Sequence, residues 1–146
     1  MITNEALVLQ ALQTVKQFYR HLDSQEIDKV VELLADDIRW HRPGGWVEGI
    51  EQAAAALEHR TPDMIIRHLV LNDVADIVSE NEVEVRYCIV SFSTNDASLG
   101  PTPETPTPSI FDCVDKLRLV DDTLKFTFRS PSAVFLRPGL ADNYAK

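Results

Sequence analysis

Hydrophobic positions in the first part of the chain follow the spacing of amphipathic helices. Apolar side chains from Val8 to Leu22 recur at intervals of one and three residues, and polar side chains fill the positions between them. This spacing is typical of one buried helical face. After a break at residues 21–24, a second apolar face from Ile27 to Leu34 predicts another helix that ends near residues 36–37. The alanine-rich segment Ile50–His59 predicts a third helix.

The pattern changes after Met64 to the alternation of strands. Branched and aromatic residues dominate, and short polar segments at residues 79–82 and 121–122 predict hairpin turns. The strands are expected at Ile38–Arg42, Ile65–Val78, Val83–Val90, Ile110–Val120 and Thr123–Ser130. Residues 100–108 contain four prolines, each lacking a backbone N–H, so we expect an extended loop there.

Helices followed by a run of antiparallel strands predict the α+β fold class. The 146 residues fit one domain by size. We therefore expect a single domain over residues 1–146, in which residues 131–146 form a C-terminal arm on the surface or against a partner.

The net charge of the chain limits which binding partners are expected. The chain carries 14 Lys and Arg against 23 Asp and Glu, a net charge of −9. Such a chain repels phosphate backbones and anionic lipids, so we expect neither nucleic acid nor membrane as a partner. With no apolar segment of membrane-spanning length and no signal peptide, the expected location is cytoplasmic. Cys88 and Cys113 are therefore expected to be reduced.

Candidate chemistry begins with a histidine in an apolar strand. In "IIRHLVLND", residues 65–73, His68 lies among branched residues, and histidine is the side chain that titrates near neutral pH. It is either a hydrogen-bonded strand residue or a titratable group at a cavity wall. The four histidines lack metal-ligand spacing, and no glycine-rich nucleotide motif is present, so we expect neither a metal nor another cofactor.

Three segments, in order, resemble a known family: "FYRHLDSQEIDKVVELLADDIRWH", "PGGWVEGIEQAAAAL" and "RHLVLND". Their order and spacing resemble the SnoaL-like branch of the nuclear transport factor 2-like superfamily over residues 5–130. The resemblance implies a cone in which a curved antiparallel sheet packs on three N-terminal helices and encloses a pocket. Members include polyketide cyclases, scytalone dehydratase, a dehydrochlorinase and dioxygenase small subunits, so fold alone does not give the function.

The dehydratase and dehydrochlorinase members imply specific site residues. By resemblance, His68 is the general base and Asp23, at the break between the first two helices, orients it. Substrate contacts are expected from Tyr19, Trp40, His41 and Asn72, the last on the same strand face as His68. Asp23 has an alternative role, because Asp23-x-x-Glu26 fits a capping box for the second helix.

The chain also departs from these enzymes. Phe18 stands where the dehydrochlorinase has a lysine, and the dehydratase's second pocket histidine and paired tyrosines have no evident match. Arg67 is expected on the opposite strand face from His68, and Arg129 is expected in a structural salt bridge.

Two functions therefore remain open. One is a cofactor-independent lyase or isomerase that acts on a small, largely apolar molecule through His68 and Asp23. The other is a non-catalytic ligand-binding or accessory-subunit protein of the same fold. Either form is expected to be a homodimer through the sheet, by resemblance. A second polar group in the pocket, within reach of a bound carbonyl, would favour catalysis.

Overall fold

A computed structural model of the chain describes residues 2–95, 101 and 104–140. Its helices are α1 (Asn4–Asp23), α2 (Ile27–Glu32) and α3 (Ile50–Glu58). Its strands are β1 (Leu34–Arg42), β2 (Gly45–Glu48), β3 (Ile65–Ser79), β4 (Glu82–Thr94), β5 (Ser109–Val120) and β6 (Thr123–Phe135). The expected α+β class is confirmed. Part of the proline-rich segment, residues 100 and 102–103, lies outside the described residues.

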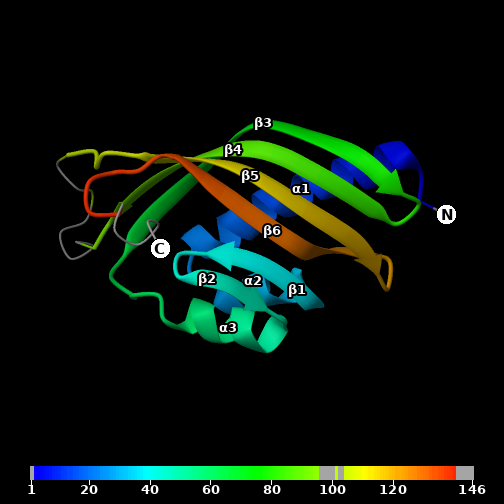
Figure 1. The fold of residues 1–146 in the computed structure, drawn as a ribbon, viewed down its shortest axis with the longest axis horizontal. Coiled ribbons are helices and arrows are strands. Elements are labelled where there is room, and N and C mark those ends of the chain that lie inside the picture. The colour runs from blue at the N-terminus through cyan, green and yellow to red at the C-terminus, as the bar shows by residue number, and fades with distance from the viewer. Residues whose placement is uncertain (1, 96–100, 102–103, 141–146) are drawn as a thin grey trace.

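The strands form a six-stranded curved sheet in the order β2-β1-β6-β5-β4-β3. Neighbouring strands are antiparallel except for β1 and β6, which are parallel. Figure 1 shows α1 running along one face of the long strands, with α2 and α3 beside β1 and β2. None of the described helices is both long and apolar enough to cross a bilayer.

The core fills the space between α1 and the sheet. The apolar stripe of α1 is buried as expected, and Thr3 begins the helix by accepting a hydrogen bond from the Ala6 N–H at 3.2 Å. Inward-facing side chains of the strands pack against this stripe. The core includes Leu7, Ala11, Val15, Phe18, Leu22, Val83, Val85, Leu117 and Phe126. One face of the sheet is thereby covered, and the other is left exposed.

The second helix is shorter than expected. It ends at Glu32, and β1 begins at Leu34 rather than at Ile38. The apolar spacing of Leu33–Ala35 fits either a helix or a strand, and backbone pairing with β6 determines that a strand forms. The Phe126 N–H donates to the Leu33 carbonyl at 2.9 Å, and Leu34 lies opposite Phe126 in β6. A partner distant in sequence therefore overrides the local preference.

The C-terminal arm was expected to begin at Pro131, but the strand β6 continues past that residue. Pro131–Phe135 continues β6 and pairs with β5, with Pro131 opposite Cys113. Proline is tolerated because the pairing of β6 with β1 runs only as far as Arg129. Beyond that point β6 has an edge at which a backbone N–H is not required. Residues 141–146 lie outside the described part of the chain.

Candidate active site

Asp23 and His68 meet where the end of α1 faces the first half of β3. Asp23 Oδ1 lies 2.5 Å from His68 Nδ1, and Asp23 Oδ2 accepts the His68 backbone N–H at 2.8 Å. Both side chains are largely buried, with exposed fractions of 11% and 12%. The carboxylate thus fixes the position of both the strand and the imidazole ring.

The capping alternative for Asp23 is wrong. Glu26 occupies the N-cap position of α2, and no side chain caps that helix. Both oxygens of Asp23 are instead directed at residue 68.

A glutamine at the helix break holds the two elements together. Gln25 has a φ of 57°, and its side-chain amide donates to the carbonyls of Pro62 and Met64 at 3.0 and 3.1 Å. These bonds attach the segment before β3 to the junction of α1 and α2. The register of β3 against Asp23 therefore depends on contacts on both sides of the break.

His68 lies at the wall of a cavity of about 230 Å³ between α1 and the concave face of the sheet. The apolar part of the wall comes from Phe18, Tyr19, Leu22, Trp40, Pro43, Ile66, Ile89, Phe111, Cys113, Pro131 and Leu140. The polar part comes from His41, Arg42, Arg60, His68, Ser91 and Ser109. Tyr19, Trp40 and His41 thus line the same cavity as His68, as expected for pocket contacts. Their role in substrate binding stays a prediction.

Asn72 does not join this cavity. Between the pairs Leu71–Cys88 and Val74–Arg86, β3 has two residues, Asn72 and Asp73, where β4 has only Tyr87. Asn72 takes up the extra residue with a φ of 56°, a left-handed conformation that asparagine tolerates better than most residues. This bulge ends the side-chain alternation. Asn72 is exposed and lines a different surface hollow, so the same-face expectation is wrong.

The bulge also gives Asp73 a structural role. Its carboxylate pairs with Lys16 of α1 at 2.7 Å. The next residue after Asn72 therefore attaches β3 to the helix that carries Asp23.

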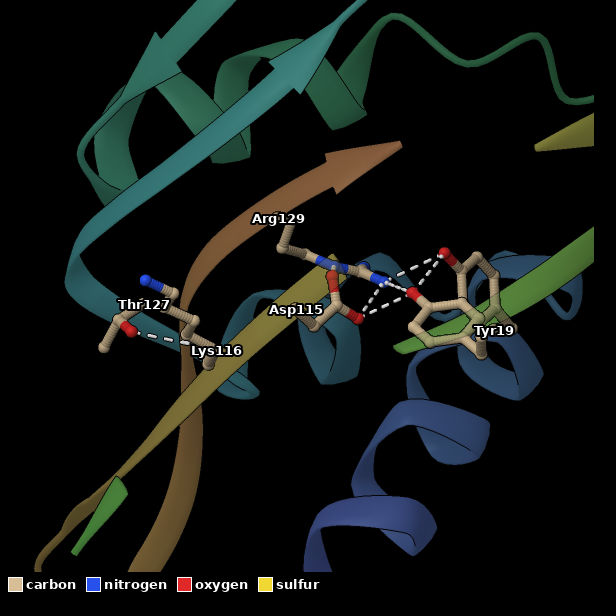
Figure 2. Close-up of polar contacts among 6 residues, drawn as sticks. Tyr19, Asp115, Lys116, Thr127 and Arg129 are labelled. Carbon is tan, nitrogen blue, oxygen red and sulfur yellow. Dashed lines mark hydrogen bonds and ion pairs between the residues drawn. The ribbon is translucent and has the colours of Figure 1, made fainter. Parts of the chain in front are cut away.

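Tyr19 links the cavity to a buried polar network (Figure 2). Its ring lies 4.9 Å from the His68 ring between centroids. Its hydroxyl lies 3.0 Å from the Tyr87 hydroxyl and accepts from Arg129 Nη2 at 2.9 Å. Burial raises the pKa of Tyr19, so the phenol stays protonated. With its hydroxyl committed to this network, Tyr19 offers the cavity only its aromatic ring.

Arg129 and Asp115 form the centre of that network, and each is about 98% buried. Arg129 Nε and Nη2 donate to the two Asp115 oxygens, each at 3.1 Å, and the Tyr87 hydroxyl donates to Asp115 Oδ2 at 2.6 Å. The expected structural salt bridge of Arg129 is present. Tyr87, an inward position of β4, was not singled out from the sequence, although alternation alone predicts that it faces the core.

Several further cavity residues were not singled out from the sequence. Ser91 of β4 and Ser109 and Phe111 of β5 continue the inward alternation of their strands, which could have indicated them. Arg42 at the end of β1 and Arg60 after α3 lie where no local pattern indicates which way a side chain points. Among the described residues, no group of three or more His, Cys, Asp or Glu side chains could hold a metal ion.

Cys113 also lines the cavity, but its thiol is not suited to nucleophilic chemistry. Burial, with a smaller effect of the Asp115 charge, raises its pKa to about 12. At pH 8 only about one Cys113 in 10⁴ is then a thiolate. We expect iodoacetamide at pH 8 to label Cys88, which is partly exposed, well before Cys113, as peptide mass spectrometry would resolve. Equal labelling of both in the folded protein would contradict this placement.

Comparison with known proteins agrees with this architecture. A family model described as a SnoaL-like domain matches residues 15–126. Among curated proteins, none matches the chain.

Solved structures with the same fold span nearly the whole chain. A provisionally named dehydratase of the NTF2-like family from Streptomyces avermitilis superposes with a TM-score of 0.76 at 14% identity, covering 92% of this chain and 100% of that one. A provisionally named scytalone dehydratase from Novosphingobium aromaticivorans DSM 12444 gives 0.72 at 19% identity, covering 86% and 83%. The β subunit of benzoate 1,2-dioxygenase from Burkholderia mallei ATCC 23344 gives 0.69 at 12%, covering 91% of each chain.

Proposed function

The chain belongs to the SnoaL-like domain family, and from this premise we propose that it is a cofactor-independent lyase or isomerase of dehydratase- or cyclase-like type. Its substrate is a small, largely apolar molecule with an acidic C–H group beside a carbonyl or leaving group. One observation carries this proposal: the contact between Asp23 and His68 at the wall of a cavity.

The proposed chemistry follows from the tautomer that Asp23 selects. Asp23 accepts a hydrogen bond from His68 Nδ1–H, which leaves a lone pair on Nε2, on the opposite side of the ring. Nε2 then takes the substrate proton, and the C–H electron pair moves toward the carbonyl oxygen. Asp23 stabilises the imidazolium that forms. Return of the proton to another carbon gives isomerisation, and its transfer to a departing hydroxyl gives dehydration.

The polarity of the cavity favours catalysis over simple apolar binding. A wall that carried only His68 as a polar group would bind a ligand without stabilising developing negative charge. Here His41 and Ser91 also line the cavity. Positioned donors in a partly dry cavity stabilise an enolate more strongly than donors in water do.

Proton exchange tests the proposal without knowledge of the natural substrate. We expect the protein to accelerate deuterium incorporation at the α-carbon of 2-tetralone in D2O, followed by the loss of its α-proton NMR signal. His68→Gln should remove most of this acceleration, about 10³- to 10⁴-fold, at the upper end of the range for loss of a general base. Exchange equal to buffer, or unchanged in folded His68→Gln, would contradict the proposal.

The second candidate, a binding or accessory protein, rests on the exposed sheet face. Large apolar side chains of β3 are half exposed, with further ones near the end of β6: Leu69, Leu71, Val74, Val78, Val134 and Phe135. Exposed apolar patches of this kind mark association surfaces. β3 is also an edge strand of the sheet, a position open to pairing with another chain. The fold is shared with a dioxygenase β subunit.

We propose that a second copy of the chain covers this face in a cytoplasmic homodimer. The double variant Leu69→Asp/Leu71→Asp should then convert the protein from dimer to monomer in light scattering coupled to size exclusion. Leu9→Asp is the matched control, because Leu9 is 69% exposed on α1 and should leave the mass unchanged. A wild-type monomer at micromolar concentration would rule this dimer out.

A further inference from the structure

The charge of the cavity wall is opposite to the charge of the protein. The whole chain carries −9, yet the side chains that line the cavity include two arginines, Arg42 and Arg60, and no carboxylate among the described residues. Asp23 and Asp115 each have a partner of their own, since Asp23 bonds to His68 and Asp115 to Arg129. A cationic cavity in an anionic protein concentrates anions at one place.

Among the described residues, Arg60 is a cation of this wall whose side chain has two donor nitrogens without a partner. It lies just after α3, where its backbone N–H donates to the Leu57 carbonyl at 3.3 Å. Its Nε and Nη2 atoms are buried and have no hydrogen-bond partner among the described residues. Burial lowers the pKa of Arg60, opposed in part by the charge of Asp23. A buried, unpaired donor is costly and calls for an acceptor.

The two unpaired atoms have the geometry of a carboxylate receptor. Nε–H and one Nη2–H point in the same direction along one edge of the planar guanidinium, and this edge binds the two oxygens of a carboxylate in parallel. Arg129, in comparison, already uses its Nε and Nη2 on Asp115. Arg42 stacks on the Trp40 ring at 4.6 Å. Arg60 therefore has a carboxylate-binding edge to which no described residue is bonded.

We propose that the ligand of this cavity is a ring compound that bears a carboxylate, and that Arg60 binds this carboxylate and determines the specificity of the site. This inference rests on the proposed function, because it specifies the substrate class of the same cavity. The carboxylate serves as an anchor, and the ring carries the acidic C–H group toward His68.

The apolar part of the cavity wall is the reason for proposing a ring in the ligand. Phe18, Trp40 and Phe111 supply aromatic surface, and Leu22 and Ile66 supply aliphatic surface. An apolar cavity of about 150 Å³ accommodates benzene, so about 230 Å³ has room for a substituted ring and a carboxylate.

A pair of probes of equal shape tests the inference. Calorimetry measures the affinities of 1-naphthoate and 1-naphthamide, and ring signals of His68 in 15N NMR report whether each occupies the cavity. We expect wild type to prefer the carboxylate by about tenfold to a hundredfold, as for a charge-assisted hydrogen-bonded pair. Arg60→Gln should abolish the preference, and Arg60→Lys should keep only part of it, since lysine retains charge without the fork.

Matched variants separate this inference from the proposed function. Arg86→Gln removes the same charge from the exposed face of β4 and should leave the preference unchanged. Equal affinity for both probes, or a preference that survives in Arg60→Gln, overturns the carboxylate inference while 2-tetralone exchange still supports the base. A clear preference for naphthoate without any exchange activity supports the inference and removes the catalytic proposal.

Discussion

Asp23→Asn is expected to reduce 2-tetralone exchange about 10³- to 10⁴-fold, the scale seen when a histidine base loses its orienting carboxylate. The reason is that asparagine has one acceptor oxygen in its side chain where aspartate has two. Asp23 supplies one oxygen to the His68 backbone N–H and the other to the imidazole. Asparagine supplies one oxygen and one NH2 donor.

The backbone N–H cannot change its role, so the asparagine oxygen is needed there. The NH2 group then faces Nδ1, and the ring adopts the tautomer that carries its proton on Nε2. That nitrogen can no longer accept a substrate proton. Asp36→Asn, an exposed position of β1, is the control and should retain full activity. Activity near wild type in folded Asp23→Asn would show that the carboxylate does not orient the base.

Arg129→Met is expected to destabilise the fold by about 3–5 kcal/mol, because it leaves the Asp115 carboxylate buried without its cation. Arg129 also packs against aromatic rings, with its guanidinium carbon 3.6 Å from the Phe18 ring centroid and 4.4 Å from that of Phe126. Urea unfolding monitored by tryptophan fluorescence measures the loss.

The double variant Asp115→Leu/Arg129→Met separates a lost charge pair from lost packing. Removal of both charges avoids the isolated buried ion, and the hydroxyls of Tyr19 and Tyr87 can still bond each other. We expect the double variant to be more stable than Arg129→Met alone. Arg86→Met, which breaks the exposed pair with Asp76, should cost less than about 1 kcal/mol. A double variant less stable than the single one would contradict this account.

Sequence patterns predict the parts of this fold that depend on local periodicity. The buried stripe of α1 and the alternation of β4 each follow from residues adjacent in the chain. The turn of the last hairpin also has a local cause, since Asp121 and Asp122 both take positive φ, as a two-residue hairpin turn requires. The resemblance adds what periodicity cannot, namely that Asp23 and His68 belong to one site.

The residues that the sequence misplaced depend on distant contacts. Asn72 has the spacing of an inward residue, but a bulge set by pairing with β4 directs it outward. Leu34 has helical spacing, but pairing with Phe126 of β6 places it in a strand. Arg60 follows a helix without any motif, and only the folded chain shows it beside His68 at one cavity. In each case long-range packing decides between locally similar alternatives.

The central claim is that Asp23 holds His68 with an unprotonated Nε2 available to the cavity. The most direct test is the 15N chemical shifts of the His68 ring, which distinguish the two neutral tautomers, in wild type and in Asp23→Asn. We predict the Nδ1–H tautomer in wild type and the Nε2–H tautomer in the variant. An Nε2–H ring in wild type, or the same tautomer in both proteins, would contradict the role of His68 as a general base oriented by Asp23.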